Sequence, residues 1–228
     1  MFADWQSIID DFKTVVPRVD FWSLRLVQDE TETLYVRDDV LQPPSLVQSR
    51  GAHISFIDRG GMAYAATSAL NREGLRTACE RALDWLAFSR RHALIAADSM
   101  PRPGYSGSYA TAVHIPWEAW SLEDKLGRLQ DINRELNIDH AIVDRQARLS
   151  RRRSQVTLVT SDGVSIDQQF HYLIPGYAAV ANRGAQTQMR SGGGWGSARQ
   201  GGLEQLAGFD FPGSARQVAE QALALVEA

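Results

Sequence analysis

The spacing of apolar residues changes along this chain, and the order of the changes limits the folds that it can adopt. Apolar residues recur at helical intervals in four segments: residues 4–15, 71–91, 121–136 and 214–226. Two stretches between them, 21–67 and 139–190, alternate instead between apolar and polar residues, as strands do. Groups of strands between helices, without strand–helix–strand alternation, predict an α+β fold: largely antiparallel sheets in two related halves with flanking helices.

Turn and cap residues predict where these elements begin and end. The expected strands are 21–26, 31–37, 52–58, 62–67, 142–148, 154–160, 165–173 and 178–183. A polar turn at Asp29-Glu30 and a break at Pro175-Gly176 interrupt these strands, and Ser161-Asp162-Gly163 forms a hairpin turn. The glycine-rich run 192–196 is expected to be a flexible loop. Asn71 is typical of a helix N-cap.

The second long helix begins with a serine and an acid at the spacing of a capping box, Ser121 and Asp124. Its buried face is expected to carry the leucines at 122, 126, 129 and 136. The single cysteine, Cys79, falls on the apolar stripe of the preceding helix, where a small buried side chain is expected rather than a reactive thiol.

The stretch rich in proline and glycine near residue 100 is the best candidate for a domain boundary. We expect an α+β half over residues 1–97, a connector over 98–116, and a second α+β half, ending in a helix, over 117–228.

Composition excludes several classes of protein. With a net charge of −3 over 228 residues and a pI near 6.0, the chain is not a strongly basic nucleic-acid binder. No apolar run reaches the ~18 residues that a membrane span needs. The amino terminus lacks the pattern of a secretory signal, and one cysteine cannot form an intrachain disulfide. We therefore expect a cytoplasmic protein with neither nucleic-acid nor membrane partners.

No catalytic, metal-binding or cofactor-binding constellation is evident in the sequence. The five histidines form no H-E-x-x-H pattern, and no G-x-S-x-G nucleophile motif is present. The glycine-rich run lacks the Lys-Ser/Thr that completes a phosphate-binding loop. We expect this chain by itself to contain no catalytic residue, metal ligand or cofactor.

One basic cluster remains, made of the arginines at 145, 148, 151, 152 and 153, with an aromatic residue at 195 in the glycine-rich run. Arginines hold carboxylates through paired hydrogen bonds, and an exposed aromatic ring often docks onto a partner. The candidates for peptide or partner contact are Arg148, Arg151, Arg153 and Trp195. The alternative interpretation is a solvated strand face followed by a mobile connector.

Three segments appear in an order that is similar to the first domain of the TldD/PmbA family of metalloprotease-related proteins. They are residues 33–41 (TLYVRDDVL), 50–56 (RGAHISF) and 60–68 (GGMAYAATS), which are followed by an Ala-rich helix. The hairpin at Ser161-Asp162-Gly163 and the glycine-rich run before a final Ala/Leu helix resemble the second half of the same family. The likeness extends over residues 18–228.

The resemblance implies a role in peptide processing. Members of the family trim peptides, are linked to modulation of DNA gyrase through toxin processing, and pair into dimers. Their zinc ligands, an H-E-x-x-x-H helix and a later cysteine, lie beyond the point where this chain ends, so zinc is expected only in a catalytic domain or partner. The resemblance also implies that an unfolded peptide lies along a sheet edge, where main-chain hydrogen bonds hold it.

Three hypotheses follow. The chain helps to form the peptide-binding cleft of a zinc metallopeptidase whose catalytic part is elsewhere, or it is a non-catalytic peptide-binding or dimerisation subunit. The third hypothesis is an unrelated α+β domain.

Overall fold

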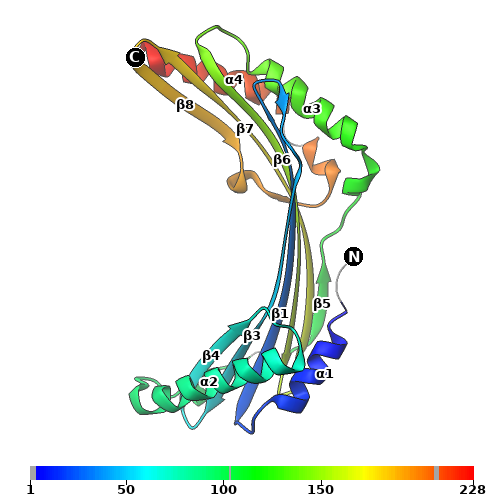
Figure 1. Cartoon of the computed structure of the whole chain (residues 1–228), viewed down its shortest axis with the longest axis vertical. Coiled ribbons are helices and arrows are strands. Elements are labelled where there is room, and N and C mark those ends of the chain that lie inside the picture. The colour runs from blue at the N-terminus through cyan, green and yellow to red at the C-terminus, as the bar shows by residue number, and fades with distance from the viewer. Residues whose placement is uncertain (1–3, 103, 208–210) are drawn as a thin grey trace. The chain divides into compact units, whose positions relative to one another are not determined.

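The computed structural model describes residues 4–102, 104–207 and 211–228, and it confirms the α+β fold and the largely antiparallel sheet (Figure 1). The α-helices are α1 (Gln6–Val15), α2 (Arg72–His92), α3 (Leu122–Glu135) and α4 (Phe211–Glu227). The strands are β1 (Phe21–Arg37), β2 (Val40–Leu41), β3 (Ser45–Asp58), β4 (Gly61–Thr67), β5 (Gly107–Ala110), β6 (Ile142–Thr160), β7 (Ser165–Arg183), β8 (Gln186–Gly193) and β9 (Arg199–Gln200).

The strands form one sheet in the order β4-β3-β1-β6-β7-β5, in which β2 also pairs with β1, and β8 and β9 pair with β7. The pairing of β5 with β7 is parallel. No helix in the part of the chain that the structure describes is long and apolar enough to cross a membrane.

The chain divides into two compact units made of interleaved segments. The first contains the residues up to Asp29, with Gln48–Ala110 and Ser154–Gln169, and the second contains Glu30–Val47, Thr111–Arg153 and Phe170–Ala228. These units are not the contiguous segments 1–97 and 117–228 of the sequence-based division. The reason is that β1, β3, β6 and β7 each contribute residues to both units.

The first unit packs α1 and α2 against β1, β3 and β4. Its core contains Phe12 from α1, Leu24 from β1, Phe56 from β3, and Leu75 and Leu86 from α2. Cys79 lies in the same cluster, as predicted for a small buried side chain, and burial raises the pKa of its thiol to about 11.

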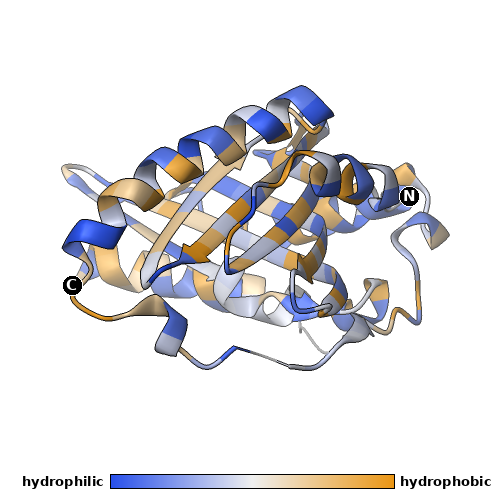
Figure 2. Cartoon of the chain, turned by 90° about the horizontal axis from the view of Figure 1, so that it is seen from below, coloured by the Kyte–Doolittle hydropathy of each residue, from blue (hydrophilic) through white to orange (hydrophobic). Residues whose placement is uncertain are grey.

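The second unit buries one face of α3 and of α4. Leu129 and Ile132 of α3 and Ala219 of α4 pack with Leu149 of β6 and Tyr177 of β7. Hydrophilic and hydrophobic residues occur together along the helices and strands of the chain (Figure 2), as elements with one buried face require.

Both predicted helix starts are confirmed. The Asn71 Oδ1 accepts a hydrogen bond of 2.8 Å from the backbone N–H of Gly74, and Ser121 and Asp124 form a reciprocal capping box. The prediction that Leu122 is buried was wrong, since it is 49% exposed in the first turn of α3. The hairpin turn at Ser161-Asp162-Gly163 is confirmed, with Gly163 at a φ of 83°.

The predicted turn at Asp29-Glu30 was wrong, because β1 continues through both residues. The predicted gap between the strands 142–148 and 154–160 was also wrong, because β6 is continuous there. Glu30 stays in the strand since its carboxylate is paired with Arg151 and Arg153 of β6, at 3.0 and 2.6 Å. Polar residues that normally indicate a turn are thus stabilised inside the sheet.

The predicted break at Pro175-Gly176 was also wrong, because β7 runs through it. Pro175 lies between the part of β7 that pairs with β9 and the part that pairs with β8, where a missing N–H is tolerated. Its carbonyl accepts a 2.7 Å hydrogen bond from Gly194. The expected flexible loop is instead the end of β8 followed by a 3₁₀ turn at Trp195–Ser197.

Candidate functional site

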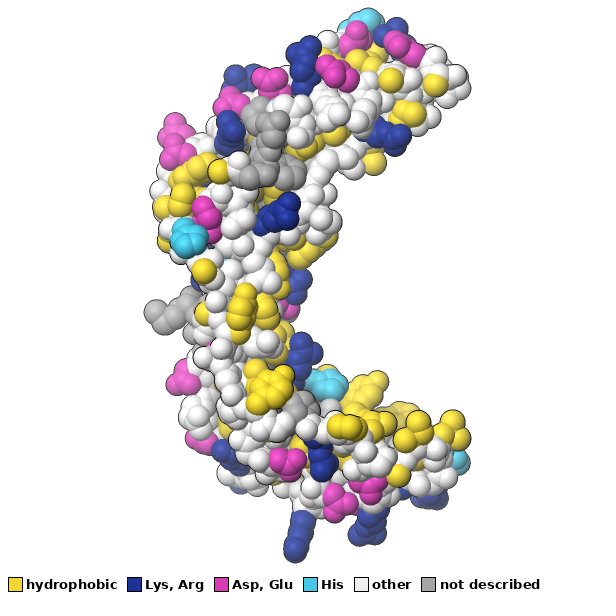
Figure 3. Space-filling model, turned by 180° about the vertical axis from the view of Figure 1, so that it is seen from behind, with side chains coloured by type: hydrophobic (Ala, Val, Ile, Leu, Met, Phe, Trp, Pro, Cys, Tyr) yellow, Lys and Arg dark blue, Asp and Glu magenta, His cyan; other side chains and the backbone are white. Residues whose placement is uncertain are grey.

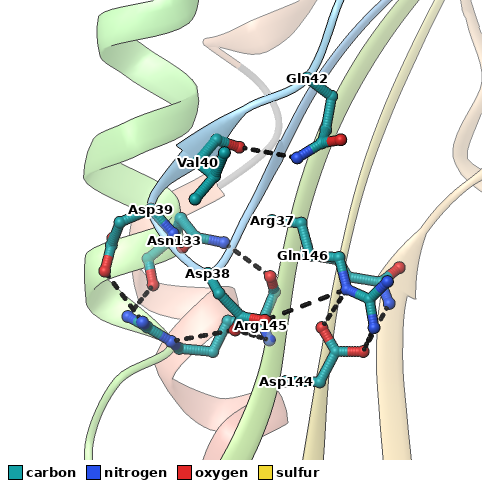
Figure 4. Close-up of polar contacts among 9 residues, drawn as sticks. All are labelled: Arg37, Asp38, Asp39, Val40, Gln42, Asn133, Asp144, Arg145 and Gln146. Atoms are coloured by element: carbon teal, nitrogen blue, oxygen red, sulfur yellow. Dashed lines mark hydrogen bonds and ion pairs between the residues drawn. The ribbon is translucent and has the colours of Figure 1, made fainter.

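Within the second unit, polar contacts with α3 and β6 fix the tip of the β1–β2 hairpin (Figure 4). Asp38 and Asp39 adopt left-handed backbone conformations, with φ of 47° and 62°. The Asp39 N–H donates to Asn133 of α3 at 2.9 Å, and the Asp38 N–H donates to the carbonyl of Arg145 at 3.0 Å. The Arg145 guanidinium in turn pairs with Asp39 at 2.9 Å. These contacts compensate for the unfavourable conformation of the turn.

A second contact joins β1 to β6 beside this tip. Arg37 donates two parallel hydrogen bonds of 3.0 Å to Asp144, and Gln146 donates to the same carboxylate at 3.0 Å (Figure 4). Directly after the hairpin, Gln42 and Pro43 form one wall of a cavity.

That cavity, of about 500 Å³, lies entirely within the second unit. Its polar side chains include Tyr35 of β1, Arg148 of β6 and Ser191 of β8, and the backbone of 192–194 closes one side. Burial is the main cause that raises the pKa of Tyr35, so its phenol is a neutral hydrogen-bonding group at physiological pH.

Glycines give the cavity its form. A side chain at Gly192 would begin 2.6 Å from the ring of Tyr177, and one at Gly176 would begin 3.6 Å from the Arg148 Nη2. The absence of a side chain at Gly192 leaves space for the Tyr177 ring. A side chain at Gly176 would be at ordinary contact distance from Arg148 but only 3.3 Å from the backbone N of Gly194, so this glycine is explained by the close approach of that backbone rather than by a break in the strand.

The cavity opens beside a sheet edge. In the described ranges, β8 pairs with β7 and with no second strand. The Gly194 N–H donates to the Pro175 carbonyl of β7. Because successive N–H groups along an antiparallel strand point alternately towards and away from the paired strand, those of Met189 and Ser191 point to the outer side of β8. An exposed edge of this kind has main-chain donors and acceptors available to an extended peptide.

The structure separates the four predicted contact residues. Arg151 and Arg153 have side chains only 11% and 19% exposed, and both pair with Glu30. Arg151 also pairs with Glu32 at 3.1 Å and with Glu118 at 2.6 Å. The alternative interpretation of a solvated basic face is therefore wrong for these two residues.

Arg148 and Trp195 are placed differently. Arg148 is exposed and lines the cavity, whereas Trp195 is 61% exposed and lies 5.5 Å from the Arg152 guanidinium, measured to the ring centroid. Sequence reasoning found Arg148 from its charge but missed Tyr35 and Gly176. No local signal indicated these two, because their role depends on strand pairing.

A smaller group of polar residues beside Arg151 is structural. The Lys125 Nζ donates to the Trp117 carbonyl at 3.1 Å and lies 4.2 Å from the ring centroid of the same residue. Burial lowers the pKa of Lys125, and burial together with Arg153 and Arg151 lowers the pKa of His171. The compact pairing of these groups leaves a cavity of only about 60 Å³.

A separate surface lies in the first unit, between β4 and α2. Met62 and Tyr64 of β4 and Trp85 and Phe88 of α2 are 45–64% exposed and line a cavity of about 490 Å³. Figure 3 shows hydrophobic side chains gathered in the lower part of the view, where this unit is drawn. β4 is a terminal strand of the sheet, with β3 as its partner in the described residues.

Zinc is held in proteins by grouped His, Cys, Asp and Glu side chains. Among the described residues, no three His, Cys, Asp or Glu side chains are grouped so that they can hold a metal ion. These residues therefore provide no zinc site of their own.

Sequence patterns of metallopeptidase domains match two parts of the chain. PmbA/TldA metallopeptidase domain 1 matches residues 22–86, and the PmbA/TldA metallopeptidase central domain matches residues 115–226. The chain belongs to the PmbA/TldD family. A search by sequence found no match among curated proteins.

Solved structures have the same fold. A proposed modulator of DNA gyrase from Thermotoga maritima superposes with a TM-score of 0.67 at 14% identity. The match covers 99% of this chain and 49% of that chain. A proposed modulator of DNA gyrase from Bacteroides thetaiotaomicron gives a TM-score of 0.63 at 14% identity, with coverages of 97% and 48%. TldE from Thermococcus kodakarensis gives 0.55 at 14% identity, with coverages of 99% and 47%. This chain thus spans about half the length of each of these three structures.

Proposed function

We propose that this chain forms part of the peptide-binding cleft of a zinc metallopeptidase that processes peptides, with the zinc bound by another domain or a partner subunit. Membership of the PmbA/TldD family supports a metallopeptidase context. The carrying observation is the open outer edge of β8 beside the cavity that Arg148 lines.

In this proposal the peptide lies antiparallel or parallel to β8 as an added strand. The outward N–H groups of Met189 and Ser191 donate to its carbonyls, and alternate peptide side chains enter the cavity. Recognition through main-chain atoms accepts many sequences, which suits a subunit that presents unfolded peptides for cleavage. Arg148 and Trp195 are the proposed contacts. Contact through Arg151 and Arg153 stays a prediction that requires their ion pairs with Glu30 to open.

The test is the substitution Ser191→Pro. Proline removes one outward N–H and is tolerated at an edge strand, so the fold is preserved while peptide binding weakens by about three- to tenfold. Fluorescence anisotropy with a labelled unstructured peptide measures the affinity, and circular dichroism checks the fold.

Ser191→Ala is the matched control, because it removes the hydroxyl and keeps the N–H. Unchanged affinity in Ser191→Pro would show that the outer edge of β8 does not hold the peptide.

The alternative is a non-catalytic peptide-binding or dimerisation subunit. The exposed apolar surface of Trp85, Phe88, Met62 and Tyr64 beside the open edge of β4 favours association. We propose that this surface associates with a second copy of the chain or with a related catalytic subunit.

We also propose that the protein is located in the cytoplasm. Its lone buried thiol supports this location, and cell fractionation tests it.

A further inference from the structure

The acidic residues of the second unit are distributed unevenly among the arginines of β6. Arg145 pairs with Asp39, Arg151 with three carboxylates, and Arg153 with Glu30. No Asp or Glu among the described residues lies within ion-pair distance of Arg148. Its guanidinium lies instead against the backbone of Gly176, in the wall of the 500 Å³ cavity.

The other walls of the cavity add hydrogen-bonding groups and no negative charge. None of the described lining residues is Asp or Glu, while Thr33, Tyr35, Ser45 and Ser191 contribute hydroxyls. Two carboxylates outside this lining act on the pKa of Tyr35, and both are paired: Asp144 with Arg37 through two hydrogen bonds, and Asp38 with Arg145 at 3.7 Å. The local charge that faces the cavity is therefore positive.

The glycines next to Arg148 make this charge accessible. Gly176, Gly193 and Gly194 lie beside the guanidinium or in the same wall, and they place no side chain over it. Arginine binds a carboxylate through two parallel hydrogen bonds, which the N–H groups along the edge of its planar guanidinium donate. The volume is within the range of sites that hold small ligands.

We propose that Arg148 and the hydroxyl-lined cavity bind a carboxylate of the peptide, supplied by an acidic side chain or by the C-terminus. This inference rests on the proposed function, because the carboxylate belongs to the peptide that lies along β8. The peptide backbone then gives affinity, and Arg148 gives preference for acidic sequences.

The experiment uses four N-terminally labelled peptides and the whole chain. Two peptides have Glu at alternate positions and two have Gln there, and each sequence is prepared with a free or an amidated C-terminus. Anisotropy is expected to show about tenfold tighter binding of the peptides that carry the recognised carboxylate. A preference for Glu identifies a side chain, and a preference for the free C-terminus identifies the terminal carboxylate.

The variant Arg148→Gln is expected to remove the preference, so that it binds all four peptides with similar affinity. Arg190→Gln is the matched control, since it removes the same charge from an exposed position of β8 that does not line the cavity. Equal binding of all four peptides by the wild type overturns the inference, as does a preference that persists in Arg148→Gln.

A second measurement separates this inference from the proposed function. Glutarate is titrated into the ¹⁵N-labelled chain, and the amides of 192–194 are followed by NMR. If no peptide binds but glutarate shifts these amides in the wild type and not in Arg148→Gln, the carboxylate site stands and the peptide role fails. If glutarate also causes no shift, the inference is overturned.

Discussion

At the scale of single residues, the partner of a charged side chain decides whether it is structural or available for binding. Arg151 and Arg148 are three positions apart on one strand, yet Arg151 is held by three carboxylates and Arg148 lines an open cavity. Removing one member of a buried pair leaves the other uncompensated, so Arg151 is expected to be intolerant of substitution.

Glu204 gives a pH-dependent prediction at the same scale. Its oxygens accept hydrogen bonds from the backbone N–H groups of Gly202 at 2.7 Å and Ile115 at 2.8 Å. Partial burial opposes its charge, but these donors outweigh it and lower the pKa of the carboxyl from 4.5 to about 2. Since the pKa is lower in the folded state, Glu204 stabilises the fold above pH 4.5, and this contribution disappears as the pH falls towards 2.

We therefore expect Glu204→Ala to lower the free energy of unfolding by about 1–2 kcal/mol at pH 7 and by much less near pH 2. Urea unfolding at several pH values measures this difference. Glu220→Ala, on the exposed side of α4, serves as the control. A difference that is the same at pH 2 and pH 7 would contradict the assignment.

At the scale of elements, long strands replace several shorter ones that the sequence predicts. β1, β6 and β7 each continue through a polar, basic or proline-containing stretch. In each case the stretch has a partner across the sheet: Glu30 of β1 and the arginines of β6 pair with each other, and Gly194, directly after β8, donates to the carbonyl of Pro175. Pairing across the sheet therefore overrides the local preference for a turn.

Asn133 connects three elements and gives a prediction at this scale. It is fully buried in α3, its Oδ1 accepts from the Asp39 N–H at 2.9 Å, and its Nδ2 donates to the Arg145 carbonyl at 3.0 Å (Figure 4). Asn133→Ala is expected to lower the free energy of unfolding by about 2 kcal/mol, because the Asp39 N–H loses its acceptor and the Arg145 carbonyl keeps only the Asp38 N–H as a donor. Denaturant unfolding measures the change.

The exposed Asn137, beyond the end of α3, provides the matched control, and Asn137→Ala is expected to unfold like the wild type. Similar unfolding of Asn133→Ala and the wild type would mean that water replaces the side chain in both hydrogen bonds.

At the scale of the whole molecule, the apolar surface on β4 and α2 predicts self-association. β4 contains no charged residue or proline, which are common protections of an edge strand, and Met62 and Tyr64 are exposed on it. A twofold axis brings the same edge of two copies together. We expect light scattering to show dimers at high protein concentration and mainly monomers in Trp85→Ser.

Val143→Ser is the control for this prediction, because Val143 is an exposed apolar residue of β6. A monomer at every concentration in the wild type would exclude self-association and leave only a related subunit as the partner of this surface.

The sequence by itself determined the α+β class, the helices with their caps, the tight hairpins and the family. These features depend on apolar periodicity and on capping residues within a few positions of one another, as at Ser121 and Asp124. Only the tertiary structure decided which strands are continuous and which arginines are paired, since Arg151 and Glu30 are 121 positions apart. It also decided that Arg148, Tyr35 and Gly176 meet at one cavity, because strand register brings together residues that no local pattern connects.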